Sequence, residues 1–278
     1  MMKTVIRKTL LYKTDVEYGD YTINHIQGCA HGCKFPCYAM LMAKRFGRIK
    51  TDKEWREPTI VENALDLLGK EIPKLKNKIN FVHLSFMTDP FMVGYPEVTN
   101  LTLKIINKLN ENNIKITLLT KGLLPKKLTN CNKYKIFNEY GISLISLDEK
   151  FKNKYEPFSS KYKERIDSLH YLHENGLNTW VSIEPFPTPN IVNQDINMIL
   201  KKVSFVNKIV FGRMNYNKLV SEYKDYQRFY NETAESVAEF CIKNNIEFHI
   251  KEKTVKKEAV EERLNLKNTK RLFRRVLS

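Results

Sequence analysis

The chain has 278 residues, of which 42% are hydrophobic and 28% charged, and its formal net charge at pH 7 is +16. This composition is typical of a globular chain, no apolar stretch is long enough for a membrane span, and the N-terminus lacks a signal-peptide core. We therefore expect a cytoplasmic protein without membrane contact. Its positive charge favours polyanions such as nucleic acid as partners, although lysines spread over solvated helix faces would give the same charge.

Strand-like and helical segments alternate from residue 22 to about residue 250, which is typical of a parallel α/β sheet. The predicted strands are 22–28, 79–86, 114–120, 142–147, 179–184 and 208–213. Apolar residues at helical spacing predict helices over 96–112 and 161–175, and a further helix over 223–245 precedes a short strand at 246–250. Six strand–helix units are too few for a closed eight-stranded barrel. We expect a partial (β/α)6 barrel of the TIM type over residues 1–250 and a basic C-terminal tail over 251–278.

Three cysteines, Cys29, Cys33 and Cys37, lie within nine residues. Three thiolates this close cannot all pair as disulfides, but they can bind three irons of a [4Fe–4S] cluster and leave the fourth iron open to a small molecule. Gly28 and Gly32 suit such a loop, because glycine permits a close backbone approach and positive φ. The cysteine motif therefore predicts an iron–sulfur site.

The same cysteines are compatible with a structural zinc site in which His25 or His31 supplies the fourth ligand. His25 lies in a predicted strand, and His31 lies within the Cys loop itself. Cys131 and Cys241 are isolated in the sequence, and a lone cysteine is usually a small buried apolar residue. From spacing alone, both the cluster and the zinc site remain open.

Residues with polar or turn chemistry follow one predicted strand after another, at the ends where the reactive groups of such barrels lie. After the first strand these are the Cys loop, and after the later ones they are segments 85–90, 120–122, 143–148, 182–185 and 212–216. We expect these segments to converge on one mouth of the barrel.

Five short motifs follow one another along the chain: Cys37-Tyr38-Ala39 at the end of the Cys loop, Thr88-Asp89-Pro90, Leu119-Thr120-Lys121, Glu156-Pro157 with Arg165, and Ile183-Glu184-Pro185. In this order they resemble the radical SAM superfamily, and within it the spore photoproduct lyase-like group, also called DNA-repair-photolyase-like. The resemblance covers roughly residues 22–215 and favours the cluster over zinc.

The resemblance implies that Cys29, Cys33 and Cys37 bind a [4Fe–4S] cluster and that S-adenosylmethionine chelates its fourth iron. These three residues and Tyr38 would be the catalytic residues. Thr88 and Asp89 would contact the amino end of S-adenosylmethionine, Lys121 its carboxylate and Tyr38 its adenine. The remaining implied contacts are Glu184, to the ribose or methionine, and Arg213, to a carboxylate or a substrate phosphate.

The implied activity is reductive cleavage of S-adenosylmethionine to a 5′-deoxyadenosyl radical, which abstracts a hydrogen atom from a substrate. The electron would come from a donor such as flavodoxin or ferredoxin, and the charge of the chain favours nucleic acid as substrate. Two alternatives are a non-catalytic, metal-stapled nucleic-acid-binding protein and a radical SAM enzyme that acts on a peptide or a small metabolite.

Two departures separate the chain from the photoproduct lyases themselves. The lyases have C-x3-C-x2-C, whereas here an extra residue gives C-x3-C-x3-C with Pro36 before the last cysteine. The lyases also place a hydrogen-donating cysteine where this chain has Met87, which has no thiol hydrogen. We therefore do not expect the chain to split thymine dimers by the lyase mechanism.

Overall fold

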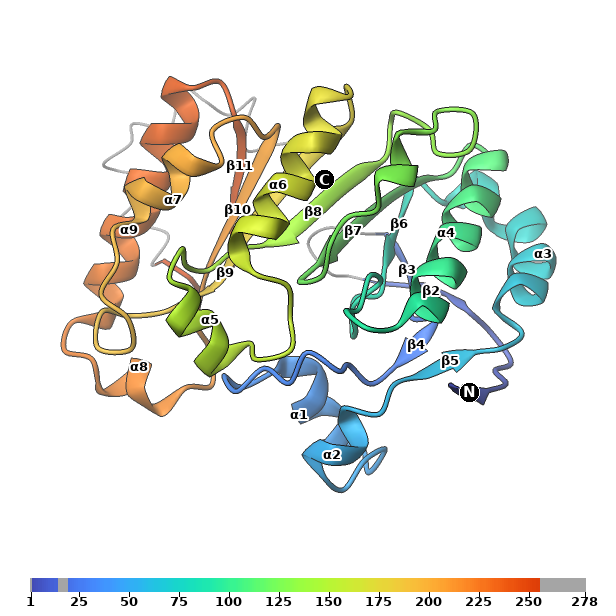
Figure 1. Ribbon diagram of the computed structural model, residues 1–278, viewed down its shortest axis with the longest axis horizontal. Coiled ribbons are helices and arrows are strands. Elements are labelled where there is room, and N and C mark those ends of the chain that lie inside the picture. The colour runs from blue at the N-terminus through green and yellow to red at the C-terminus, as the bar shows by residue number, and fades with distance from the viewer. Residues whose placement is uncertain (1, 15–19, 256–278) are drawn as a thin grey trace. The chain divides into compact units, whose positions relative to one another are not determined.

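The computed structural model describes residues 2–14 and 20–255 (Figure 1). The chain forms two compact units, a first unit of residues 1–142 and 148–179 and a second unit of residues 143–147 and 180–278. Most of the predicted tail, 251–278, lies outside the described residues. The division into a domain of residues 1–250 and this tail stays a prediction.

The main sheet of the first unit is built from parallel strands in the order β3 (Tyr21–Ile23), β6 (Phe81–Leu84), β7 (Lys115–Thr120) and β8 (Glu139–Ser143). Strand β2 (Leu11–Lys13) pairs antiparallel with β3. Val82, Ile116 and Ile142 are completely buried, as expected for parallel strands covered on both faces. Strand β8 begins three residues before the predicted 142–147, because residues 139–142 pair with residues 117–120 of β7.

Helices α3 (Ala64–Leu75) and α4 (Pro96–Glu111) lie side by side along this sheet (Figure 1). Helix α4 begins at a proline, whose missing N–H costs nothing in the first turn. Helix α6 (Tyr162–Glu174) ends just before Gly176, whose φ of +77° is suited to a helix terminus. The shorter helices of the unit are α5 (Glu149–Tyr155), η1 (Lys76–Lys78) and η2 (Lys126–Thr129).

A second, three-stranded sheet of the first unit has the order β1 (Lys3–Val5), β5 (Thr59–Val61) and β4 (Ile26–Gln27). The single strand predicted over 22–28 is therefore wrong, because β3 and β4 pair in different sheets. Asn24 separates them: its carbonyl accepts from Arg7 and its side-chain oxygen accepts from the Met87 backbone N–H. Helices α1 (Tyr38–Arg45) and α2 (Asp52–Trp55) connect β4 to β5.

The second unit has parallel strands in the order β9 (Asn178–Phe186), β10 (Lys208–Arg213) and β11 (Glu247–Ile250), where β9 begins in the first unit. Residues 143–147 join β9 through the Leu144 N–H, which donates to the Ser182 carbonyl at 2.9 Å. The helices are α7 (Ile196–Lys202), α8 (Lys218–Glu222) and α9 (Tyr226–Lys243). Within residues 2–14 and 20–255, no helix has the length and apolar character needed to cross a membrane.

Candidate functional site

The Cys loop runs from the end of β4 to the start of α1, where Cys37 is the N-cap residue. Gly28 and Gly32 both have positive φ, +82° and +62°. A Cβ on Gly28 would lie 2.6 Å from the Trp55 carbonyl oxygen, and a Cβ on Gly32 would lie 2.8 Å from the Phe158 ring. Only glycine allows this backbone to pack so closely, so the loop conformation is built into the sequence at these two positions.

All three thiols of the Cys loop line one cavity of 670 Å³, the thiol cavity, which also includes Trp55 and Phe158. Burial raises the pKa of Cys33 to about 12 and raises the pKa of Cys29 well above its usual range. The neighbouring thiols raise both values further, because three adjacent thiolates would repel each other. Ionised sulfur is therefore favourable in this cavity only when a cation is bound there, as for a metal or cluster ligand.

Both histidines near the Cys loop are held by a hydrogen bond at Nε2, while Nδ1 of each has no hydrogen-bond partner among the described residues. His25 is buried, with Nε2 2.7 Å from the Thr102 hydroxyl, and burial lowers its pKa to about 3, helped by the charge of Arg7. His31 is also buried, and its Nε2 accepts from the Val93 N–H at 3.4 Å. Over residues 2–14 and 20–255, no three His, Cys, Asp or Glu side chains are grouped so as to hold a metal ion. This holds for the three cysteines of the loop as well, so it does not separate the zinc site from the cluster.

Asp89, which follows β6, joins the ends of two neighbouring strands. Its Oδ1 accepts from the Thr120 hydroxyl at 2.6 Å and from the Phe91 N–H at 2.9 Å, and its Oδ2 accepts from the Lys121 N–H at 2.7 Å. The carboxylate is buried, so it fixes segment 120–121 against the loop after β6. Its predicted contact with the amino group of S-adenosylmethionine stays a prediction.

Thr88 precedes Asp89 in this loop and, unlike the Asp89 carboxylate, is not hydrogen-bonded through its side chain within the described part of the chain. Its hydroxyl oxygen is buried, and among the described residues it has no hydrogen-bond partner. The Ser85 hydroxyl, on a residue with φ of +59°, is in the same condition. Because buried polar atoms are nearly always hydrogen-bonded, two unpaired hydroxyls in one loop mark a place where a ligand or a water molecule would supply the missing partner.

A buried charge network, which we call the Glu156 network, connects β7 to α6. The Glu156 carboxylate, 0% exposed, pairs with the Lys121 ammonium and with Arg165 Nη2, the latter at 2.6 Å. Burial alone would raise the pKa of Glu156, but the two cations outweigh it and lower the pKa to about 2. The Lys121 ammonium also lies 5.1 Å from the centre of the Phe35 ring. The sequence pointed to each of these residues, but not to their pairing.

The segment that carries Glu156 is tied to the Cys loop by its backbone. The Lys34 N–H donates to the Tyr155 carbonyl at 2.8 Å, and the Phe158 N–H donates to the His31 carbonyl at 3.2 Å. Lys121, Glu156 and Arg165 are close enough to influence the pKa of Cys33 electrostatically. The Glu156 network is therefore linked to the Cys loop through residues 155–158.

The structure brings four of the six predicted cofactor residues into the first unit with the Cys loop: Tyr38, Thr88, Asp89 and Lys121. Tyr38 is 48% exposed at the start of α1. Glu184 and Arg213 belong to the second unit. There the Glu184 carboxylate lies 3.1 Å from the Lys251 ammonium and its side chain packs over Gly212, while Arg213 Nε donates to Asn215 Oδ1 at 2.8 Å. All six cofactor contacts stay predictions.

The chain belongs to the radical SAM superfamily, whose family model matches residues 23–203. An uncharacterized protein of Methanocaldococcus jannaschii is 30% identical over 230 residues, which are 81% of this chain and 82% of that protein. A spore photoproduct lyase mutant with bound AdoMet and dinucleoside spore photoproduct has a similar structure, with a TM-score of 0.67 at 12% identity, covering 89% of this chain and 80% of the lyase. Streptococcus suis SuiB bound to the precursor peptide SuiA gives a TM-score of 0.53 at 16% identity, covering 82% of this chain and 49% of SuiB.

These matches confirm the predicted class, a radical SAM partial (β/α)6 barrel similar to spore photoproduct lyase. Membership of the superfamily makes the chain an enzyme of the radical SAM class. The identities to the solved structures are low, so those structures establish the fold and leave the reaction to be inferred from the residues of this chain.

Proposed function

We propose that Cys29, Cys33 and Cys37 bind a [4Fe–4S] cluster, that S-adenosylmethionine occupies its open iron, and that the enzyme abstracts a hydrogen atom from a substrate. The observation that carries the proposal is that all three cysteines line the thiol cavity, within the region matched by the family. When bound, the reduced cluster and S-adenosylmethionine supply a 5′-deoxyadenosyl radical.

The extra residue of the C-x3-C-x3-C spacing is compatible with this ligand set. Phe35 is buried, and the Lys121 ammonium covers its ring. Pro36 has no N–H to satisfy, so it can precede Cys37 at the start of α1 without leaving an unpaired donor. With the insertion, the Phe35 side chain is buried and all three cysteines still line the thiol cavity.

The protein residues have two tasks in this proposal. Asp89 and the Glu156 network hold the loops around the thiol cavity, and the unpaired Thr88 hydroxyl is available to S-adenosylmethionine. Tyr38, Asp89, Lys121, Glu184 and Arg213 remain the other proposed contacts to the cofactor. Lys121 would serve both tasks. Its ammonium already pairs with the Glu156 carboxylate and can also donate to the carboxylate of S-adenosylmethionine.

The electron would come from an external donor of the flavodoxin or ferredoxin type. Outside the Cys loop the sequence has only Cys131, which is exposed, and Cys241, which is buried. Two isolated cysteines cannot ligate a second cluster, which normally takes four.

Anaerobic reconstitution with iron and sulfide tests the proposal. We expect about four iron and four sulfide per chain, and release of 5′-deoxyadenosine from S-adenosylmethionine after reduction. Cys33→Ala should lose both the cluster and the cleavage, because two thiols cannot hold the cube. The matched control, Cys131→Ala, removes an exposed thiol outside the loop and should keep both.

Two results would contradict the proposal. A Cys33→Ala protein that still binds four irons and cleaves S-adenosylmethionine would refute the ligand set. Wild-type protein that takes up zinc, binds oligonucleotides and never releases 5′-deoxyadenosine would instead be the non-catalytic, metal-stapled binding protein. No observation on the described residues favours a peptide or a small metabolite as the substrate.

A further inference from the structure

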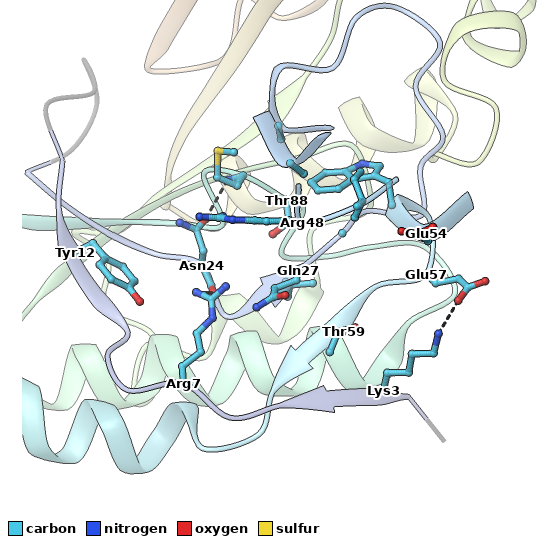
Figure 2. Close-up of a pocket in the computed structure, with 17 residues that line it drawn as sticks. Lys3, Arg7, Tyr12, Asn24, Gln27, Arg48, Glu54, Glu57, Thr59 and Thr88 are labelled. Atoms are coloured by element: carbon cyan, nitrogen blue, oxygen red, sulfur yellow. Dashed lines mark hydrogen bonds and ion pairs between the residues drawn. The ribbon is translucent and has the colours of Figure 1, made fainter. Parts of the chain in front are cut away.

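A second cavity of the first unit has a volume of 560 Å³ and borders the Cys loop at Gly28 (Figure 2). We call it the arginine cavity, because Arg7, next to β1, and Arg48, just after α1, both line it. Asn24, Gln27 and Thr88 also face it. None of the cofactor contacts proposed above accounts for the two arginines.

The two guanidinium groups of the arginine cavity lack acidic partners among the described residues. Arg7 Nη1 donates to the Asn24 carbonyl at 3.1 Å, and Arg7 Nη2 lies 2.8 Å from the Gln27 side-chain amide. Arg48 has only the Phe46 ring, 5.8 Å from its guanidinium carbon. Both cations therefore keep their full charge toward the cavity.

The two acids that line the same cavity are already engaged. Glu57 pairs with the Lys3 ammonium at 2.7 Å, and Glu54 accepts from the Lys50 N–H and from the Thr51 hydroxyl. Figure 2 shows these acids on the side of Lys3, away from Arg7 and Asn24. The donors to Glu54 are neutral, so its charge remains beside those of Arg7 and Arg48, and the net charge of the cavity lining is positive on the side of the arginines.

Unpaired polar groups accompany the positive charge. The Asn24 side-chain oxygen accepts from the Met87 N–H at 3.0 Å, whereas its NH₂ group has no partner in the described part of the chain. Thr88, whose hydroxyl is proposed above to contact S-adenosylmethionine, also lines this cavity, so the two ligands would be neighbours. A ligand of this cavity is therefore offered guanidinium groups for an anion and hydrogen-bond donors beside them.

Exposed aromatic rings lie at the same place. Tyr12 lines the cavity and is 38% exposed, and Phe46, next to Arg48, is 66% exposed. Guanidinium groups that bind phosphates, amides that read polar edges and aromatic faces that stack on bases are the combination by which proteins bind single-stranded nucleic acid. The net charge of +16 acts in the same direction.

We propose that the arginine cavity binds a single nucleic-acid strand, with Arg7 and Arg48 on consecutive phosphates and an unstacked nucleotide in the cavity. A volume of 560 Å³ suits a small ligand and is too small for a duplex. Gly28, which lines the cavity, directly precedes Cys29, so a bound nucleotide lies next to the Cys loop. The inference names the substrate class of the proposed radical SAM enzyme, and only in that sense does it rest on the proposed function.

Fluorescence anisotropy of a labelled single-stranded oligonucleotide with the reconstituted full chain tests the inference. Arg7→Gln/Arg48→Gln should weaken binding roughly tenfold and reduce the slope of log K against log salt by about 1.4, because two phosphate contacts of about 0.7 each are lost. Arg48→Gln alone should show half of this slope change. It removes an exposed side chain with no hydrogen bond in the described structure, so its folding is not at risk. The matched control is Arg45→Gln, an exposed arginine of α1 outside the cavity.

Equal affinities for the wild type, the double variant and Arg45→Gln would overturn the inference. So would competition by a mononucleotide or inorganic phosphate as strong as that by the oligonucleotide, because the site would then be one for a free phosphate compound. Release of 5′-deoxyadenosine without oligonucleotide is measured on the same proteins and should not change. Wild-type protein that shows the binding pattern but no release refutes the proposed function alone, and release without oligonucleotide binding refutes this inference alone.

Discussion

The thiol cavity and the arginine cavity both border the Cys loop, yet they differ in how the charged side chains around them are paired. Around the thiol cavity the buried carboxylates are satisfied within the protein: Glu156 pairs with two cations, and Asp89 accepts three hydrogen bonds from neutral donors. In the arginine cavity neither guanidinium group pairs with a carboxylate among the described residues, although Glu54 and Glu57 line the same cavity. Charge that is neutralised inside the protein stabilises the fold, whereas charge without a counter-ion is available to a ligand.

The largest effect on stability should come from the Glu156 network. Glu156→Gln leaves the Lys121 ammonium and the buried Arg165 guanidinium without a counter-ion, so we expect a loss of about 3–5 kcal/mol. Thermal or urea unfolding measures it. A variant as stable as the wild type would show that the pairing of Glu156 with Lys121 and Arg165 does not stabilise the fold. The two cavities would then no longer differ in this respect.

The same network predicts a dependence of stability on pH. The pKa of Glu156 in the folded state is about 2, below the ordinary value of 4.5, so its stabilisation is complete above about pH 4.5 and is lost as the pH falls toward 2. The difference in unfolding free energy between the wild type and Glu156→Gln should therefore narrow from pH 5 to pH 2, pH values chosen to bracket these two pKa values. A constant difference across that range would mean that Glu156 is not held ionised.

A smaller effect is expected for Gly28→Ala. An alanine at this position would have to keep the φ of +82°, and its methyl group would lie 2.6 Å from the Trp55 carbonyl oxygen. We therefore expect a loss of about 1–3 kcal/mol in the free energy of unfolding and weaker uptake of iron. Gly69→Ala is the matched control, because Gly69 lies within α3 and a Cβ there would have its nearest contact at 3.7 Å. That change should stabilise the protein by about 0.5–1 kcal/mol. Equal effects at the two positions would contradict the close packing of the Cys loop.

The smallest effect on stability should come from Arg48→Gln, within about 0.5 kcal/mol of the wild type. Its side chain is exposed, and its contact is with the Phe46 ring. Together with the loss of oligonucleotide affinity, this result would show that one side of the Cys loop is built for binding. A large loss of stability would instead show that Arg48, like Glu156, stabilises the fold.

The sequence was sufficient to predict the elements with strong local patterns. Helix α4 occupies 96–111 against a predicted 96–112, α6 occupies 162–174 against 161–175, and β10 matches 208–213. The three-residue strands β1 and β5 were missed because so short a segment shows no periodicity. Helix α3 was missed although its apolar residues recur at helical spacing; it contains Pro73, a residue that normally ends a helix pattern.

The candidate site was predictable where adjacent residues form a motif, and not where the fold brings distant residues together. The Cys loop and segment 88–90 were identified from the sequence, and the structure places them in one unit. The pairing of Glu156 with Lys121 joins residues 35 positions apart. Arg7 and Arg48, which no motif connects, meet only because β1 and the end of α1 border the same cavity. Tertiary contacts of this kind leave no local signal.

Two backbone hydrogen bonds, from the Phe158 N–H to the His31 carbonyl and from the Lys34 N–H to the Tyr155 carbonyl, constrain the order in which the Cys loop is completed. They join parts of the chain that are more than 120 residues apart, so their closure is a late event in folding. Until residues 155–158 have been synthesised and docked, the Cys loop lacks these two bonds and has only contacts such as that between His31 and Val93. For the proposed cluster, we therefore expect delivery of iron and sulfide to be productive only after the first unit has folded, because a chain released earlier lacks these two bonds.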